Sequence, residues 1–189
     1  VESLDDVKDL RRAGVPLVDV SGAVEAPGVV RVSNDNVAIG RLGGEHLAAL
    51  GLEHYCFAAA EGSLWSDERL QGFRNATASV RDREVEVFSQ SIDWWKNPEF
   101  SRELAAFLAR QKRPFGIMSA NDIIGMNVVG ACRLAGLAIP ADVALVSVDN
   151  EEFLCELSAP AMSSIPFDRH EIGLRAAERL DAMMQGLIE

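Results

Sequence analysis

Cysteine is scarce in this sequence, and its few cysteines are not arranged for a covalent bond or a metal. The three residues lie far apart, with no Cys-x-x-Cys pair and no histidine at metal-ligand spacing. A disulfide framework and a zinc site are therefore both disfavoured. We expect reduced thiols, as in a cytoplasmic protein, with no metal site and no cofactor.

Long apolar runs are also missing. The longest ones have the length of β-strands, whereas a transmembrane helix needs about 20 consecutive apolar residues. We expect a soluble protein that has no membrane partner. Its 48% hydrophobic and 25% charged residues are typical of an ordinary globular chain, and 189 residues give room for one large domain or two modest lobes.

Basic residues are outnumbered by acidic ones. The chain carries 18 Lys and Arg against 29 Asp and Glu, which gives a formal net charge of −11. Proteins bind the phosphate backbone of nucleic acids through Lys and Arg that displace counterions. This chain is therefore not expected to hold DNA by itself.

Signatures of common catalytic sites are absent too. The sequence has no Gly-x-Ser-x-Gly, no His-Glu-x-x-His, no phosphate-binding P-loop and no Gly-x-Gly-x-x-Gly. We expect no catalytic residues. A sugar-processing enzyme stays as an alternative, because Asp149, Glu151 and Glu152 could pair as general acid and base.

The elements that are present alternate between apolar strands and amphipathic helices. This alternation is typical of parallel sheets built from right-handed βαβ units, so we expect an α/β fold. Strands are expected over residues 15–20, 29–33, 55–60, 84–88, 115–118 and 143–148. Helices are expected over residues 4–12, 38–50, 67–80, 98–110, 121–135 and 169–184.

The rhythm breaks after residue 162, where a short extended piece precedes the last helix. If the chain crosses between two lobes near Leu52 and again near Ile165, two crossings would make a hinge. We then expect residues 1–52 and 165–189 to form a partial amino-terminal lobe and residues 53–164 a carboxyl-terminal lobe. Because the chain starts without Met and inside an expected helix, we expect it to be a fragment.

Three of the apolar runs end on clusters of polar side chains. The clusters are Ser119 to Asp122, Asp149 to Glu152, and Trp65 to Arg69, the last a few residues after its strand. Groups at the carboxyl ends of parallel strands converge on one crevice, where open α/β sheets bind small ligands. The pattern therefore predicts a binding site.

Each candidate also has a purely structural interpretation. Asn121 could be a helix N-cap, and Asp149 could be a turn residue. Arg69 lies in a first helical turn, where a cation is unfavourable; it could offer paired donors to sugar hydroxyls or form an ion pair with a nearby carboxylate. Trp65 could stack on a sugar ring or be a half-buried aromatic residue.

Several short motifs occur in a distinctive order along the chain. They are Asp35-Asn36, Glu45-His46-Leu47, Arg69-x-x-Gly72-Phe73, Ala120-Asn121-Asp122, Ile139-Pro140-x-Asp142-Val143, Val148-Asp149-Asn150 and Ser163-Ser164-Ile165. In this order they resemble the effector-binding core of LacI-type bacterial repressors, which is similar to periplasmic sugar-binding proteins. The segments around Trp65 and Asp149 look most like the xylose-operon regulators, in which the sensor is joined to an AraC-type helix-turn-helix part.

The resemblance implies a periplasmic-binding-protein-like fold of type I, with two doubly wound parallel-sheet lobes joined by a hinge. The amino-terminal lobe would be incomplete here, and the DNA-binding domain would be absent from this chain. The implied ligand is a sugar, with xylose as the family-level expectation, and DNA would be bound only through a separate domain. The residues implied in ligand binding are Trp65, Arg69, Asn121, Asp149 and Asp35.

Two further expectations concern partners. We expect a homodimer, because some of Ile124, Val128, Val129 and Cys132 of helix 121–135 could serve a subunit interface, although core packing is the default for such residues. The adjacent Trp94 and Trp95 cannot both face the core from a regular element. The alternative function is an extracytoplasmic sugar-binding protein that delivers its ligand to a transporter.

Overall fold

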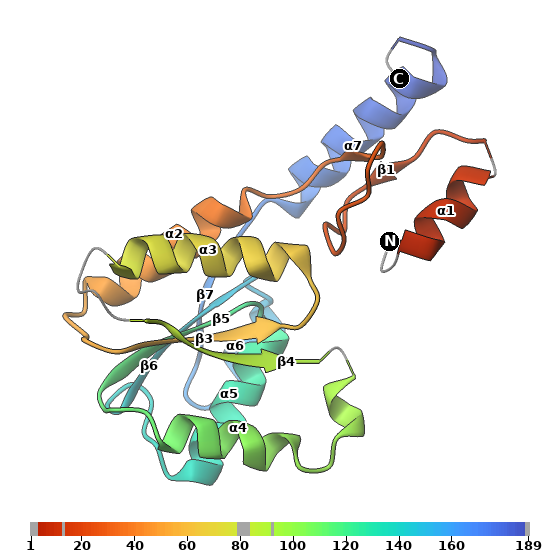
Figure 1. Ribbon diagram of the computed structural model, residues 1–189. Helices are drawn as coiled ribbons and strands as arrows, with labels where there is room; N and C mark the ends of the chain where they lie inside the picture. The colour runs from red at the N-terminus through yellow and green to blue at the C-terminus, as the bar shows by residue number, and fades with distance from the viewer. Residues whose placement is uncertain (1–3, 13, 79–83, 92, 188–189) are drawn as a thin grey trace. The chain divides into compact units, whose positions relative to one another are not determined.

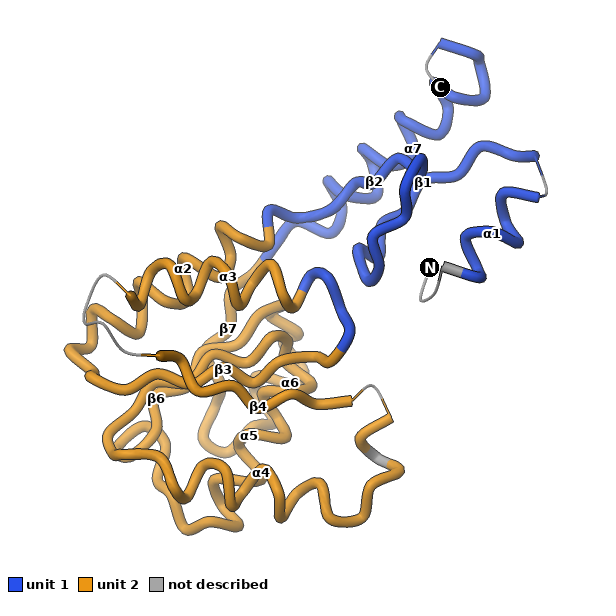
Figure 2. The backbone as a smooth tube through the Cα atoms, viewed as in Figure 1, with its two compact units in different colours: residues 1–35, 62–65, 167–189 blue, residues 36–61, 66–166 orange. Residues whose placement is uncertain are grey.

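A computed structural model describes residues 4–12, 14–78, 84–91 and 93–187 of the chain. Its backbone divides into two compact units (Figures 1 and 2). Unit 1 comprises residues 1–35, 62–65 and 167–189, and unit 2 comprises residues 36–61 and 66–166. The chain therefore passes from one unit to the other at four places.

Unit 2 is built on a five-stranded sheet whose neighbouring strands are all parallel, in the order β4-β3-β5-β6-β7. Every residue of the central strand β5 is buried, as expected when helices cover both faces of a parallel sheet. The strands are β3 (Tyr55–Ala60), β4 (Glu86–Gln90), β5 (Phe115–Ser119), β6 (Val143–Val148) and β7 (Ser163–Ile165).

Helices cover the two faces of this sheet. Figure 1 shows α2 (Asn36–Ala48) and α3 (Leu64–Ala78) over one face, and α4 (Phe100–Ala109) and α5 (Asp122–Ala135) over the other. A 3-10 turn, η1 (Trp94–Lys96), follows β4, and the short helix α6 (Glu152–Leu157) follows β6. The parallel α/β fold expected from the alternation of elements is thus confirmed, and in unit 2 it has the doubly wound arrangement that the resemblance implied.

Local chemistry explains the two helices on the second face. In α4 the apolar residues at helical spacing, Phe100 and Leu104 among them, are all buried. In α5 the side chain of Asn121 accepts a hydrogen bond of 2.9 Å from the backbone N–H of Ile124, which confirms the N-cap interpretation. The four α5 residues considered for an interface are in the core, so that possibility is excluded: Ile124, Val128, Val129 and Cys132.

Helices α2 and α3 approach each other so closely that glycine is required on both. A Cβ atom on Gly40 would lie 1.9 Å from the carbonyl oxygen of Arg69, and one on Gly72 would lie 1.9 Å from that of Val37. The two backbones are therefore in direct contact. This contact holds the middle of α3 against the first turns of α2.

The division of the chain differs from the one that the sequence predicted. We expected the first crossing near Leu52, but the structure has it between residues 35 and 36, so that α2 belongs to unit 2. Helix α2 packs on β5 and β6 through its buried Leu47 and through Gly43, where a Cβ would meet the sulfur of Met118. The last crossing, between residues 166 and 167, lies close to the expected one.

Unit 1 consists of α1 (Leu4–Arg12), β1 (Val18–Asp19), β2 (Val30–Arg31) and α7 (Arg169–Met184), together with residues 62–65. Strands β1 and β2 are parallel and pair over only two residues each, which is why both are shorter than the apolar runs predicted. Helix α7 contacts β1, yet none of the α7 residues is buried.

The three cysteines are all buried free thiols. Burial raises the pKa of the Cys56 and Cys132 thiols to about 12, because the thiolate would lose its water. Among the residues that the structure describes, no helix combines the length and the hydropathy that a bilayer span needs.

Candidate ligand-binding site

Arg69 lies at the centre of a buried polar cluster in unit 2. It is carried by α3, is only 4% exposed, and donates from Nε to Oδ1 of Asn36 at 3.0 Å. One terminal nitrogen donates to the carbonyl oxygen of Ala120 and lies 3.7 Å from a carboxylate oxygen of Asp149. A single guanidinium thus joins the start of α2 to the ends of β5 and β6.

This cluster lies where open α/β sheets bind ligands. From β3 the chain continues to β4 on one side, and the next strand, β5, lies on the other side of β3. The order of the strands therefore reverses between β3 and β5, and crevices at such switch points are the usual ligand sites of this architecture. Ala120, to which Arg69 donates, directly follows β5.

Several carboxylates surround the positive charge of Arg69 within the cluster. Burial lowers the pKa of the guanidinium, while the carboxylates of Asp149, Asp122 and Glu68 act in the opposite direction, Asp149 most strongly. Asn36 connects two of these groups, since its Nδ2 donates to Glu68 at 2.9 Å while its oxygen accepts from Arg69. A balanced set of fixed donors and acceptors suits a neutral polyhydroxyl compound better than an anion.

Asp149 has an unfavourable backbone conformation. Its φ is +112° and that of the next residue, Asn150, is +50°, a region that favours glycine. The backbone N–H of Asp149 donates to the carbonyl oxygen of Ile165 at 3.0 Å. Asp149 is thus a turn residue, and the turn sets its carboxylate opposite Arg69. Such strain persists only where the surroundings hold it, and it is concentrated at functional sites.

The structure brings some of the predicted site residues together. Arg69 and Asp149 form an ion pair, and Asn121 follows the residue to which Arg69 donates. The half-buried Trp65, in the first turn of α3, and the exposed Asp35 belong to unit 1. The backbone N–H of Trp65 donates to Gly22 of the same unit at 3.2 Å. The role of all five residues in ligand binding stays a prediction.

A hollow of about 340 Å³ lies at the same end of the sheet, beyond the carboxyl ends of β3 and β4. The Trp94 ring lines it and packs on Phe100, with ring centroids 5.2 Å apart. Lys96, Glu61 and Asp93 add charged groups to its wall. The sequence did not predict that Trp94 lines a hollow. Its position beside the strand ends depends on the turn η1, which the sequence pattern did not indicate.

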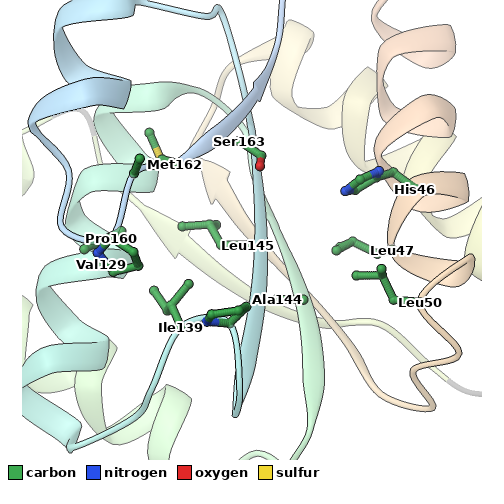
Figure 3. A pocket seen from close by; sticks show the side chains of 12 residues that line it. His46, Leu47, Leu50, Val129, Ile139, Ala144, Leu145, Pro160, Met162 and Ser163 are labelled. Carbon is green, nitrogen blue, oxygen red and sulfur yellow. The ribbon is translucent and has the colours of Figure 1, made fainter.

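Another hollow, of about 250 Å³, lies elsewhere in unit 2 and has a different character (Figure 3). It lies along β6, with residues of α2 on one side and Val129 of α5 and Met162 on the other, and apart from His46 and Ser163 the residues of its wall are apolar. It offers few partners for hydroxyl groups, so the polar cluster around Arg69 remains the candidate site.

Two residues of the cluster were missed at the sequence level. Asn36 was noted only as part of a motif, although it is the buried partner of both Arg69 and Glu68. Asp122 is completely buried, whereas an acid in the first turn of a helix ordinarily faces solvent. Asp122 belonged to the polar cluster after the strand over residues 115–118, and Asn36 lay two residues before an expected helix, but neither position indicated a buried partner.

Comparisons with known proteins agree with this architecture. Residues 45–188 match the family described as periplasmic binding protein-like domain. The xylose operon regulatory protein of Haemophilus influenzae is 26% identical over 201 residues, which cover 98% of this chain and 51% of that protein. The chain therefore spans about half the length of the curated relatives it matches.

Two solved structures show the same fold. The transcriptional regulator CelR in complex with cellobiose superposes with a TM-score of 0.78 at 26% identity, over 95% of this chain and 55% of that one. The xylose-binding transcription activator xylR superposes with a TM-score of 0.81 at 23% identity, over 98% of this chain and 50% of that one. Together with the family match, these similarities confirm the resemblance inferred from the motifs: the chain belongs to the periplasmic binding protein-like domain family.

Proposed function

We propose that this chain is the sugar-sensing part of a bacterial transcriptional regulator, and that it carries out no chemical conversion. The observation that carries the proposal is the buried Arg69, held with Asn36 and Asp149 at the switch point of the sheet. Fixed donors and acceptors of this kind select ligands by their hydroxyl groups, because an analogue that lacks one leaves a buried partner unpaired. The similarity to xylose operon regulators supports D-xylose as the first ligand to test.

In the mechanism that we propose, a sugar bound by Arg69, Asn121 and Asp149 also contacts unit 1, where Trp65 and Asp35 are the candidates. Closure of the two units around the ligand is then the signal. A ligand that binds the closed form about a hundredfold better shifts the equilibrium by about 2.7 kcal/mol. DNA binding resides in a separate domain, since the net charge of −11 opposes DNA binding by this chain.

The proposal is tested by thermal denaturation with a panel of D-xylose, D-ribose, D-glucose and cellobiose. At a concentration about 100 times its Kd, a sugar that binds only the folded state adds about 2.7 kcal/mol of stability. Arg69→Ala abolishes this stabilisation, and Arg69→Lys, which keeps the charge but loses the forked donors, weakens it. Arg102→Ala is the control, because that side chain is 75% exposed and its ion pair is with Glu99, the N-cap residue of α4. No stabilisation of the wild type by any neutral sugar would refute the proposal.

We also propose a homodimer, with an interface that includes α6 rather than the buried residues of α5. Phe153 and Leu157 are 73% and 63% exposed and lie four residues apart, on one side of the helix. Large exposed apolar side chains that share a face commonly mark protein contacts. Sedimentation should report a dimer for the wild type and a monomer for the double variant Phe153→Asp, Leu157→Asp.

A further inference from the structure

Asp122 is a buried carboxylate whose contacts lie outside its own helix. It is the first residue of α5 and has no exposed surface. Oδ2 accepts a hydrogen bond of 2.7 Å from the backbone N–H of Glu151, and Oδ1 accepts one of 2.6 Å from the hydroxyl of Ser164. The thiol of Cys155 donates to Oδ2 as well, at 3.5 Å. These donors come from the segment that follows β6 and from β7.

The contacts of Asp122 enclose the strained turn that carries Asp149. The Oγ of Ser164, which donates to Asp122, accepts the backbone N–H of Asn150 at 2.9 Å. Both backbone N–H groups that follow Asp149 therefore depend on Asp122, that of Glu151 directly and that of Asn150 through a hydroxyl. Two consecutive residues with positive φ need such external support, because their own conformational preference opposes this turn.

A carboxylate is the side chain that this position requires. The carboxylate offers two acceptor oxygens for three donors, whereas an asparagine would offer one oxygen and add donors of its own. The amino terminus of α5, with its partial positive charge, favours an anion there. An acid at this place usually stabilises the start of its own helix. Here Asn121 already caps α5, so Asp122 is not needed for that purpose.

We propose that Asp122 is a positioning residue that holds the turn at residues 149–151 in its strained form and so keeps the carboxylate of Asp149 opposite Arg69. Asp122 sets the ligand affinity of the site without touching the ligand. Only the affinity part of this inference rests on the proposed sugar-binding function, because the conformation of the turn can be measured without a ligand.

The ligand-free test is amide hydrogen exchange measured by NMR on the wild type and three variants. Asp122→Ala removes the acceptor for Glu151 and the anchor of Ser164, so exchange at Asn150 and Glu151 should accelerate at least about tenfold. Ser164→Ala removes the acceptor for Asn150 and one donor to Asp122 but leaves the hydrogen bond from Glu151 to Asp122, so exchange should accelerate at Asn150 and not at Glu151. Val128→Ala is the matched control, since it removes buried atoms from the same helix away from the turn; neither amide should respond to it specifically.

The second test is the affinity for D-xylose, or for the sugar of the panel that stabilises the wild type most, measured by titration calorimetry. Asp122→Ala should weaken binding about tenfold or more and Ser164→Ala less, while Val128→Ala should leave the Kd unchanged although it lowers stability. The proposal would be overturned if neither Asp122→Ala nor Ser164→Ala changed the exchange at Asn150 and Glu151. It would also be overturned if Val128→Ala lost as much affinity for the sugar as Asp122→Ala. If no sugar binds the wild type, the proposed function fails, while the exchange experiment still decides the role of Asp122. If Asp122→Ala does not fold, Ser164→Ala decides alone.

Discussion

Replacing Gly72 by alanine should separate α2 from α3 and destabilise unit 2. The new methyl carbon would lie 1.9 Å from the carbonyl oxygen of Val37 and 2.8 Å from the backbone nitrogen of Arg41. Because side-chain carbons essentially never approach closer than 3.0 Å, the backbones must part by about 1 Å or more. Overpacking this severe costs about 3 kcal/mol of folding stability, the upper end of the usual range. The higher helix propensity of alanine returns about 1 kcal/mol. We therefore expect a net loss of about 2 kcal/mol.

The same displacement should reach the candidate site, because α3 carries Arg69. Its 3.0 Å hydrogen bond to Asn36 spans the two helices and should lengthen when they part. Urea denaturation followed by circular dichroism gives the stability, and thermal shift with sugar reports on the site. Gly130→Ala is the matched control: this helical glycine of α5 has no atom within 4 Å of the added Cβ, so alanine should stabilise by up to about 1 kcal/mol. A Gly72→Ala variant as stable as the wild type would refute the close helix contact.

Three further predictions concern the turn, the cap and the thiols. Because residue 149 has a φ of +112°, the variant Asp149→Gly should be about 1 kcal/mol more stable than Asp149→Ala in urea denaturation, and both variants should lose the stabilisation by sugar. Equal stability of the two variants would contradict the strain. Asn121→Ala should cost about 1 kcal/mol through the lost N-cap, and Asn121→Ser should restore most of it in the same assay. The thiols of Cys56 and Cys132 have a pKa near 12 when folded and near 9 when exposed, so between these values the folded state binds more protons and stability falls as pH rises. Melting temperatures from about pH 8 to about pH 11 should show this fall, and Cys56→Ala should reduce its slope.

The sequence predicted those helices and strands whose buried residues are apolar and regularly spaced. Helix α4 shows its buried face through aromatic and aliphatic residues at helical spacing, and β5 is a plain apolar run. Helix α2 gave no such signal, because it meets the sheet and α3 partly through Gly40, Gly43 and Gly44. Glycines carry no hydropathy, so the packing of α2 on unit 2 could not be seen, and the boundary was placed after the helix.

The sequence predicted the site from polar clusters that follow the strands and from Arg69, which was expected in the first turn of a helix over residues 67–80, where a cation is unfavourable. That position was wrong, because α3 begins at Leu64 and Arg69 lies in its second turn. The pairing of Arg69 with Asp149 and Asn36 depends on how α3 lies over the strand ends, and no spacing in the sequence encodes it. Asp122 was part of the polar cluster that follows β5, but it also fits the common pattern of an acid at a helix start, so its supporting role could not be inferred before its burial was known.

The four passages of the chain between the two units have a consequence for any attempt to redesign this protein. Asn36 is the first residue of unit 2 after the chain leaves residue 35, and its side chain accepts a hydrogen bond from Arg69. Ile165 lies one residue before the chain leaves unit 2, and its carbonyl oxygen accepts the backbone N–H of Asp149. The hydroxyl of Ser66, at a third passage, accepts the backbone N–H of Ala60. Under the proposed function, the residues that select the ligand overlap with those that connect the two units, and a biosensor engineer who alters ligand selectivity should expect to recalibrate the response as well.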